Sequence, residues 1–252
     1  GPRGGGGGGE DHPPPPPTSG RPPEIDAVIF DLDGTLLDTE SISDASILDA
    51  FGPSLSRAVR DAMIEREGGR YRLPWELKRR ILGLRGSEWI PTVMEYAAEH
   101  WGVVTLNGKD EDGDGDGLPP PPPDLDRFWS EWERRLEERC VDVGECPGAT
   151  ALVMSLHDAG IPMAIATSSR AESVKKKRIK HQNIFSRIPH IVTGDDPAVP
   201  RGKPHPDIYL EASRRLGVPP ERCLAFEDAV SGVKSALGAG CRVCAVPDSR
   251  WA

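Results

Sequence analysis

Two aspartates directly follow the first apolar run of the chain. In IDAVIFDLDGTLLDTE, residues 25–40, Asp31 and Asp33 flank a single leucine and precede a Gly-Thr pair. Carboxylates this close repel each other unless a cation lies among them. Mg²⁺ suits such a cluster because it binds a few carboxylates together with waters and phosphate oxygens. The spacing therefore predicts a metal-assisted site where a buried strand ends.

Polar residues follow three further apolar runs or the loops just past them. Thr167 and Ser168 follow the apolar run MAIA, Lys203 lies in GKPHPD ahead of a helical pattern, and Glu227 and Asp228 end LAFED. One acidic residue after a strand is an ordinary helix cap. Because ligands bind at the carboxyl ends of strands in open parallel sheets, four such features together indicate one shared site.

Phosphoryl transfer is the chemistry that these side chains fit. Asp31, Asp33 and Asp228 would supply oxygen ligands to one Mg²⁺. Lys203 and Thr167 would hold the remaining phosphate oxygens, and the backbone N–H groups of Ser168 and of the turn at 32–35 would add donors.

The two neighbouring aspartates can divide the reaction between them. Asp31, ionised beside the metal and the lysine, can attack phosphorus to give an aspartyl-phosphate. Asp33 can protonate the leaving alkoxide and then deprotonate the water that hydrolyses the intermediate. Asp38, the third carboxylate, is expected only to hold the turn at which the chain leaves the core.

Strands and helices alternate through the second half of the chain. Buried strands are expected at 25–30, 161–167, 190–193, 222–226 and 242–246, and helices at 148–159, 170–182, 206–216 and 229–239. This alternation predicts an α/β, Rossmann-like core whose parallel sheet is covered by helices on both faces.

A helical insert is expected between the first and second strands. Two apolar stripes recur there at helical spacing, formed by Ile90, Val93, Met94, Ala97, Ala98 and Trp101 and by Leu125, Phe128, Trp132 and Leu136. Such stripes usually pack in a core. We expect a small α-helical domain over 39–146, inserted between core segments 24–38 and 147–252.

Two segments are too biased in composition to form a core. Residues 1–23 are rich in Gly, Pro and Arg, which predicts a disordered leader. The stretch 107–123 contains KDEDGDGDGLPPPPP, whose start resembles a calcium loop. Pro123 stands where that loop needs a bidentate carboxylate, so a low-complexity loop is the better interpretation.

Bulk properties narrow the class of protein. The net charge of −9 argues against a nucleic-acid binder, and no apolar run is long enough to span a membrane. Five cysteines in 252 residues favour a reducing, cytoplasmic setting, although an organellar address stays open because the first residue is Gly rather than Met. The basic run KKKRIK, residues 175–180, is interpreted as a solvated helix face rather than an RNA contact. The oligomeric state stays open.

The four features, in this order over residues 25–247, resemble the four motifs of the haloacid dehalogenase (HAD) superfamily. DxDGTLLDTE, the insert behind it, GKPxPD and FEDAxxGVxxA look like the subgroup with a small helical cap, and most of the core is similar to the pseudouridine-5′-phosphatases. The resemblance implies a Mg²⁺-dependent phosphoric monoester hydrolase acting on a small phosphorylated metabolite, with pseudouridine 5′-phosphate as the best guess.

Site roles follow from the same resemblance. It makes Asp31 the nucleophile and Asp33 the acid/base, with Thr167 and Lys203 orienting phosphate and nucleophile. It assigns Mg²⁺ to Asp31, the Asp33 carbonyl and Asp228, with Glu227 nearby. True dehalogenases of the superfamily lack the second aspartate, because a halide leaving group needs no proton.

The helical cap carries the choice of substrate. ILGLRGSEW, residues 81–89, resembles the cap loop that relatives place over the active site, with Gly83 and Arg85 facing the ligand. A solvated surface arginine is the alternative for Arg85. A β-phosphoglucomutase-like sugar phosphomutase is the alternative function, because mutases share all four motifs.

Two other classes are disfavoured. A non-catalytic binding module would be expected to have lost the nucleophile, the lysine or a metal ligand, and all are present. A dinucleotide oxidoreductase would need G-x-G-x-x-G after the first strand, which is missing.

Overall fold

A computed structural model describes residues 24–81, 86–103 and 124–248, without the side chains of 86–88. The expected leader at 1–23, the cap-loop residues Gly83 and Arg85, and the low-complexity loop at 107–123 lie outside the described residues.

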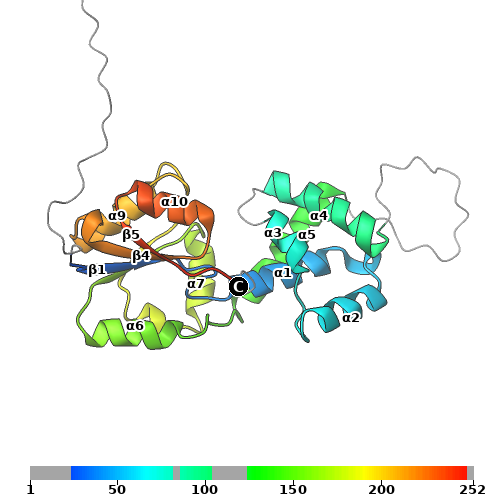
Figure 1. Ribbon diagram of the computed structural model, residues 1–252, viewed down its shortest axis with the longest axis horizontal. Helices are drawn as coiled ribbons and strands as arrows, with labels where there is room; N and C mark the ends of the chain where they lie inside the picture. The colour runs from blue at the N-terminus through cyan, green and yellow to red at the C-terminus, as the bar shows by residue number, and fades with distance from the viewer. Residues whose placement is uncertain (1–23, 82–85, 104–123, 249–252) are drawn as a thin grey trace, which may run out of the picture.

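Five parallel strands form one sheet (Figure 1). Its order is β3-β2-β1-β4-β5, with all four neighbouring pairs parallel. The strands are β1 (Ala27–Phe30), β2 (Met163–Ala166), β3 (His190–Val192), β4 (Cys223–Glu227) and β5 (Arg242–Ala245). The first strand lies in the middle, so its carboxyl end is flanked by those of β2 and β4. The α/β fold class predicted from the alternation is confirmed.

Helices cover both faces of the sheet. Ala27 and Ile29 of β1 pack with α9 (Asp207–Leu216) and α10 (Val230–Gly238), which Figure 1 shows above the sheet. The opposite face packs on three helices, α6 (Ala149–Asp158), α7 (Ala171–Arg178) and α8 (Gln182–Phe185). The helix expected over 170–182 ends earlier, at Arg178, because the chain turns there before α8 begins at Gln182. A short 3₁₀ turn, η2 (Pro220–Arg222), leads into β4.

The insert between β1 and β2 is helical and has an apolar cluster of its own. Its elements are α1 (Thr39–Ala50), η1 (Gly52–Ser54), α2 (Arg57–Arg66), α3 (Trp75–Ile81), α4 (Gly86–Trp101) and α5 (Leu125–Cys140), which Figure 1 shows beside the sheet domain. Val93, Ala97 and Phe128 are fully buried in this cluster. Leu125 is 51% exposed, so its expected place in the stripe is wrong: it lies in the first turn of α5, beyond the packed part of that helix.

The chain leaves the core and returns to it through two adjacent segments. Leu37 and Glu145 form an antiparallel bridge, and the Asp38 N–H donates to the Gly144 carbonyl at 2.9 Å. Asp38 caps α1, accepting from the N–H and the hydroxyl of Ser41 at 3.2 and 2.6 Å. As expected, it holds the turn where the insert begins.

Within the described part of the chain, none of the helices combines the length and the apolar character that a membrane crossing requires.

Candidate active site

The loop after β1 places Asp31 at the centre of the sheet's carboxyl edge. Its backbone N–H donates to the carbonyl of Phe226 in β4 at 2.9 Å, and its side chain is buried. Gly34 turns the chain with φ +88°, a conformation that favours glycine, and donates its N–H to the Leu37 carbonyl at 2.8 Å. The strand therefore ends in a tight turn that presents the carboxylate.

Lys203, in the loop before α9, contacts the carboxylate of Asp31. Its ammonium lies 2.5 Å from Oδ1 of Asp31 and 2.5 Å from Oε1 of Glu227. The hydroxyl of Tyr209 donates to the same Oε1 at 2.8 Å, and the Glu227 side chain is 1% exposed. Glu227 thus anchors the lysine that contacts Asp31, a role that sequence reasoning did not give it.

Three carboxylates converge beside that lysine. Oxygen atoms of Asp31, Glu227 and Asp228 all lie within 4.8 Å of one another. Burial raises the pKa of Asp31 well above its usual range, against the charge of Lys203. Burial, together with the charges of Glu40 and Glu227, raises the pKa of Asp228 to about 7. In the described region Lys203 is the cation paired with this cluster, so the excess negative charge and the oxygen donors fit a hard divalent cation.

Asp33 belongs to a second hydrogen-bond network, whose other members follow β2, whereas Glu227 and Asp228 lie at the end of β4 on the opposite side of β1. Its Oδ2 accepts from the hydroxyls of Thr167 and Ser169 at 3.0 and 2.7 Å, and its Oδ1 lies 2.5 Å from the ammonium of Lys177. Burial alone would raise the pKa of Asp33, but the charge of Lys177 and the hydrogen bonds of these three donors lower it below its ordinary value. The two aspartates therefore have separate partners and separate environments.

Lys177 corrects the interpretation of the basic run at 175–180 as a solvated face. Lys175 and Lys180 are exposed and pair with surface carboxylates, but Lys177 is only 3% exposed and points inward from α7. The available signal was its position three residues after Val174, which is buried on the same face. Ser169 was also missed, one residue beyond the predicted Ser168.

Six of the predicted site residues meet at this edge of the sheet. They form the two networks just described and are Asp31, Asp33, Thr167, Lys203, Glu227 and Asp228. The hydroxyl of Thr167 contacts Asp33 rather than Asp31. Ser168 has an exposed side chain and joins neither network. Gly83 and Arg85 lie outside the described residues.

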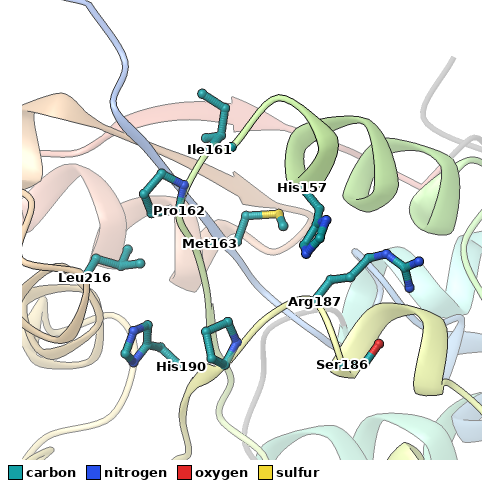
Figure 2. A pocket seen from close by; sticks show the side chains of 10 residues that line it. His157, Ile161, Pro162, Met163, Ser186, Arg187, His190 and Leu216 are labelled. Carbon is teal, nitrogen blue, oxygen red and sulfur yellow. The ribbon is translucent and has the colours of Figure 1, made fainter.

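A separate pocket of about 400 Å³ lies at the other end of the strands (Figure 2). Met163 and His190, which begin β2 and β3, line it together with His157 and Arg187. The predicted site residues follow the carboxyl ends of β1, β2 and β4 instead, so this pocket is not part of the candidate active site.

Comparisons with known proteins identify the family of the chain. Residues 25–240 match the family model of haloacid dehalogenase-like hydrolases. The chain is 35% identical to (DL)-glycerol-3-phosphatase 1, mitochondrial, of Arabidopsis thaliana over 88% of its own length and 64% of the relative's. It is 33% identical to a Drosophila melanogaster protein named probable pseudouridine-5′-phosphatase, covering 88% of this chain and 81% of that one.

Solved structures show the same fold. A HAD family hydrolase from Deinococcus radiodurans, with bound phosphate and sodium, aligns with a TM-score of 0.58 and 29% identity over 87% of this chain and 79% of that one. CbbY from Rhodobacter sphaeroides, in complex with phosphate, aligns with a TM-score of 0.56 and 26% identity over 89% and 87%. The family match and these relatives confirm the resemblance seen in the motifs: the chain belongs to the haloacid dehalogenase-like hydrolases, as an enzyme of the phosphoric monoester hydrolase type.

Proposed function

We propose that this protein is a Mg²⁺-dependent phosphatase that hydrolyses a small phosphomonoester through an aspartyl-phosphate on Asp31. The observation that carries the proposal is the separation of the two aspartates. Asp31 pairs with Lys203 beside a cluster of carboxylates, whereas Asp33 is held by Lys177, Ser169 and Thr167. Because the two carboxyl groups have different partners, each can take a different part in the reaction.

In the first step an Oδ of Asp31 attacks phosphorus and the bond from phosphorus to the ester oxygen breaks. Asp33 donates its proton to the departing alkoxide, which leaves as an alcohol. Lys203 offsets negative charge on the transferring phosphoryl group and keeps the carboxylate of Asp31 oriented. The products of this step are the alcohol and the aspartyl-phosphate.

In the second step Asp33, now ionised, takes a proton from water while the water oxygen bonds to phosphorus. The bond from phosphorus to Asp31 breaks, which releases inorganic phosphate and restores both carboxyl groups to their starting states. Attack on the phosphorus atom, rather than on the carboxyl carbon, returns the original Asp31 oxygens to the enzyme.

Asp31, the Asp33 carbonyl and Asp228 would hold Mg²⁺, with Glu227 nearby. Their oxygen atoms form the hard donor set that Mg²⁺ prefers, and the cluster has more carboxylates than cations in the described region. When bound, the metal would offset charge on the phosphoryl oxygens.

Phosphate release from 4-nitrophenyl phosphate tests the proposal directly. We expect release that requires Mg²⁺, stops with EDTA and returns when Mg²⁺ is restored. Asp31→Asn should abolish it, and undiminished activity of that variant would refute the mechanism. A sugar phosphomutase shares these residues, but it would release little phosphate and convert β-glucose 1-phosphate to glucose 6-phosphate.

The natural substrate is proposed to be a nucleoside or polyol monophosphate. Relatives named as glycerol-3-phosphatases, pseudouridine-5′-phosphatases and hexitol phosphatase A support this class. A panel containing glycerol 3-phosphate, pseudouridine 5′-phosphate and a hexitol phosphate ranks the candidates by kcat/KM. A ranking led by pseudouridine 5′-phosphate would support the best guess made from the sequence.

A further inference from the structure

Three donors hold both oxygens of the Asp33 carboxylate. Thr167 and Ser169 donate to Oδ2, and Lys177 lies 2.5 Å from Oδ1. Lys177 also donates to the Ser169 hydroxyl at 2.8 Å, while the Ser169 N–H donates to the Thr167 hydroxyl at 3.0 Å. The donors thus also hydrogen-bond to one another, and together they fix the position and orientation of the Asp33 carboxylate.

The side chain of Lys177 is buried, and its ammonium pairs with Asp33. Its side chain is 4% exposed, whereas that of Lys175, two residues earlier on α7, is 72% exposed and pairs with Glu172 on the same helix. Burying an ammonium is costly unless a carboxylate pairs with it, and the carboxylate paired with Lys177 is that of Asp33. A lysine placed only for solubility would not be buried.

This fixed position matters because Asp33 has another negatively charged carboxylate close by. Asp31 is two residues away, and repulsion between the two carboxylates would displace Asp33 if nothing held it. A general acid works only within hydrogen-bond reach of the leaving oxygen, and a misplacement of about 1 Å can cost roughly 100-fold in rate. Lys177 supplies a fixed positive charge that opposes this displacement.

We propose that Lys177 is a positioning residue for the proton transfers of this enzyme, holding the Asp33 carboxylate where it serves the leaving group and the attacking water. The inference rests on the proposed function, in which Asp33 is the acid/base. Lys203 then orients the nucleophile and Lys177 orients the proton carrier, so the site uses two lysines for two aspartates.

The test is Lys177→Met, compared on two substrates that differ in their need for a proton. Glycerol 3-phosphate releases a strongly basic alkoxide, whereas 4-nitrophenyl phosphate releases a weakly basic phenolate. Because kcat/KM reports the steps through formation of the aspartyl-phosphate, we expect it to fall about 10–100-fold for glycerol 3-phosphate and less than about 3-fold for the aryl ester. Hydrolysis of the intermediate needs the base for both substrates, so kcat should fall for both.

Lys175→Met is the matched control, because it removes an exposed lysine from the same helix. It should leave all four kinetic constants unchanged. An equal loss of kcat/KM on both substrates in Lys177→Met would overturn the inference, since a general structural defect would act on both. If the unmodified protein hydrolyses neither substrate, the proposed function itself fails, which is a different result.

A double-mutant cycle gives a second, independent readout. In an Asp33→Asn background, Lys177→Met should cause no further loss of activity on 4-nitrophenyl phosphate if it acts through Asp33. An additional loss in that background would contradict the inference. Where Lys177→Met does not fold, Ser169→Ala replaces it in both experiments. This variant removes only the hydroxyl that bridges Lys177 and Asp33. We expect the same difference between the two substrates, with smaller losses of kcat/KM and kcat.

Discussion

Gly34 lies directly against the carboxylate of Asp228. A Cβ atom built on Gly34 would overlap both the carboxyl carbon and an oxygen of that side chain. The turn after β1 and the residue after β4 therefore touch across 194 positions of sequence. This contact explains why the residue after Asp33 has no side chain: it leaves room for an acidic group to approach the nucleophile's turn.

Gly34→Ala should abolish activity. The new methyl group would push Asp228 out of the carboxylate cluster, and the positive φ of residue 34 would add backbone strain. We expect phosphate release to fall at least about 100-fold, measured with saturating Mg²⁺. Gly217→Ala is the matched control, since Gly217 has φ +67° with open space around its Cβ position. It should lose about 1 kcal/mol of stability and keep its activity. Equal activity losses in the two variants would contradict the prediction.

Glu227→Gln should impair catalysis without unfolding the protein. The amide keeps the shape of the side chain but removes the charge that Lys203 shares between Glu227 and Asp31. We expect kcat to fall about 10–100-fold, consistent with loss of a charge-assisted contact worth roughly 1.5–3 kcal/mol. Tyr209→Phe removes the neutral donor to the same oxygen and should cost less than about 10-fold. Steady-state kinetics on both variants checks this order, and a larger loss in Tyr209→Phe would refute it.

The positions of the strands and the sheet edge could be predicted because their signals are local. The burial expected for the strand at 242–246 is wrong, because β5 is an edge strand and is mostly exposed. Buried parallel strands read as continuous apolar runs, and Asp31, Thr167, Glu227 and Asp228 lie at the end of such a run or directly after it. Lys203 lies in the long loop between β3 and α9 and was identified by its GKPHPD motif. The carboxyl end of the helix expected over 170–182 and the exposure of Leu125 were not predicted, because they depend on tertiary packing, which no local pattern records.

Lys177 was missed for a related reason. In the sequence, a buried lysine cannot be told from the exposed lysines beside it. Which lysine of α7 points inward depends on the face that this helix turns toward the sheet. The roles of Glu227 and Tyr209 in holding Lys203 are equally invisible, because the three residues come from separate elements. Sequence reasoning found the groups that carry chemistry more readily than the groups that hold them in place.

Lys78→Met should strongly destabilise the protein. The side chain of Lys78 is 5% exposed. Its ammonium pairs with Glu40 and lies 2.6 Å from a carboxylate oxygen of Asp44, which is fully buried. Removing the cation leaves the buried carboxylate of Asp44 without it, and breaking a buried pair typically costs about 3–5 kcal/mol. Urea unfolding at neutral pH measures the change. Arg57→Met, which removes an exposed pair with Asp61, should have little effect. Similar losses in both variants would show that the buried pair has no special importance.

Asp49 links four parts of the helical insert. Its carboxylate accepts from Tyr71 at 2.8 Å and from Arg60 at 2.9 Å, and it also pairs with Arg139. Burial alone would raise the pKa of Asp49, but these hydrogen bonds and charges lower it below the ordinary value. A carboxyl group with a lowered pKa in the folded state stabilises the protein above its unfolded pKa of about 3.9, and this stability is lost as the pH falls through the folded pKa.

Asp49→Asn should therefore remove a pH-dependent part of the stability. At pH 7 we expect a loss of about 1–2 kcal/mol, since the side chain is partly solvated. Below about pH 4 the difference from the unmodified protein should shrink, because the carboxyl group of the unfolded chain becomes protonated first and that of the folded protein follows as the pH falls through its lowered pKa. Urea unfolding at pH 7, 5 and 3 measures the trend, and Asp61→Asn, on the exposed surface of α2, is the matched control. A stability difference that stays constant from pH 7 to pH 3 would mean that the charge of Asp49 contributes nothing to folding.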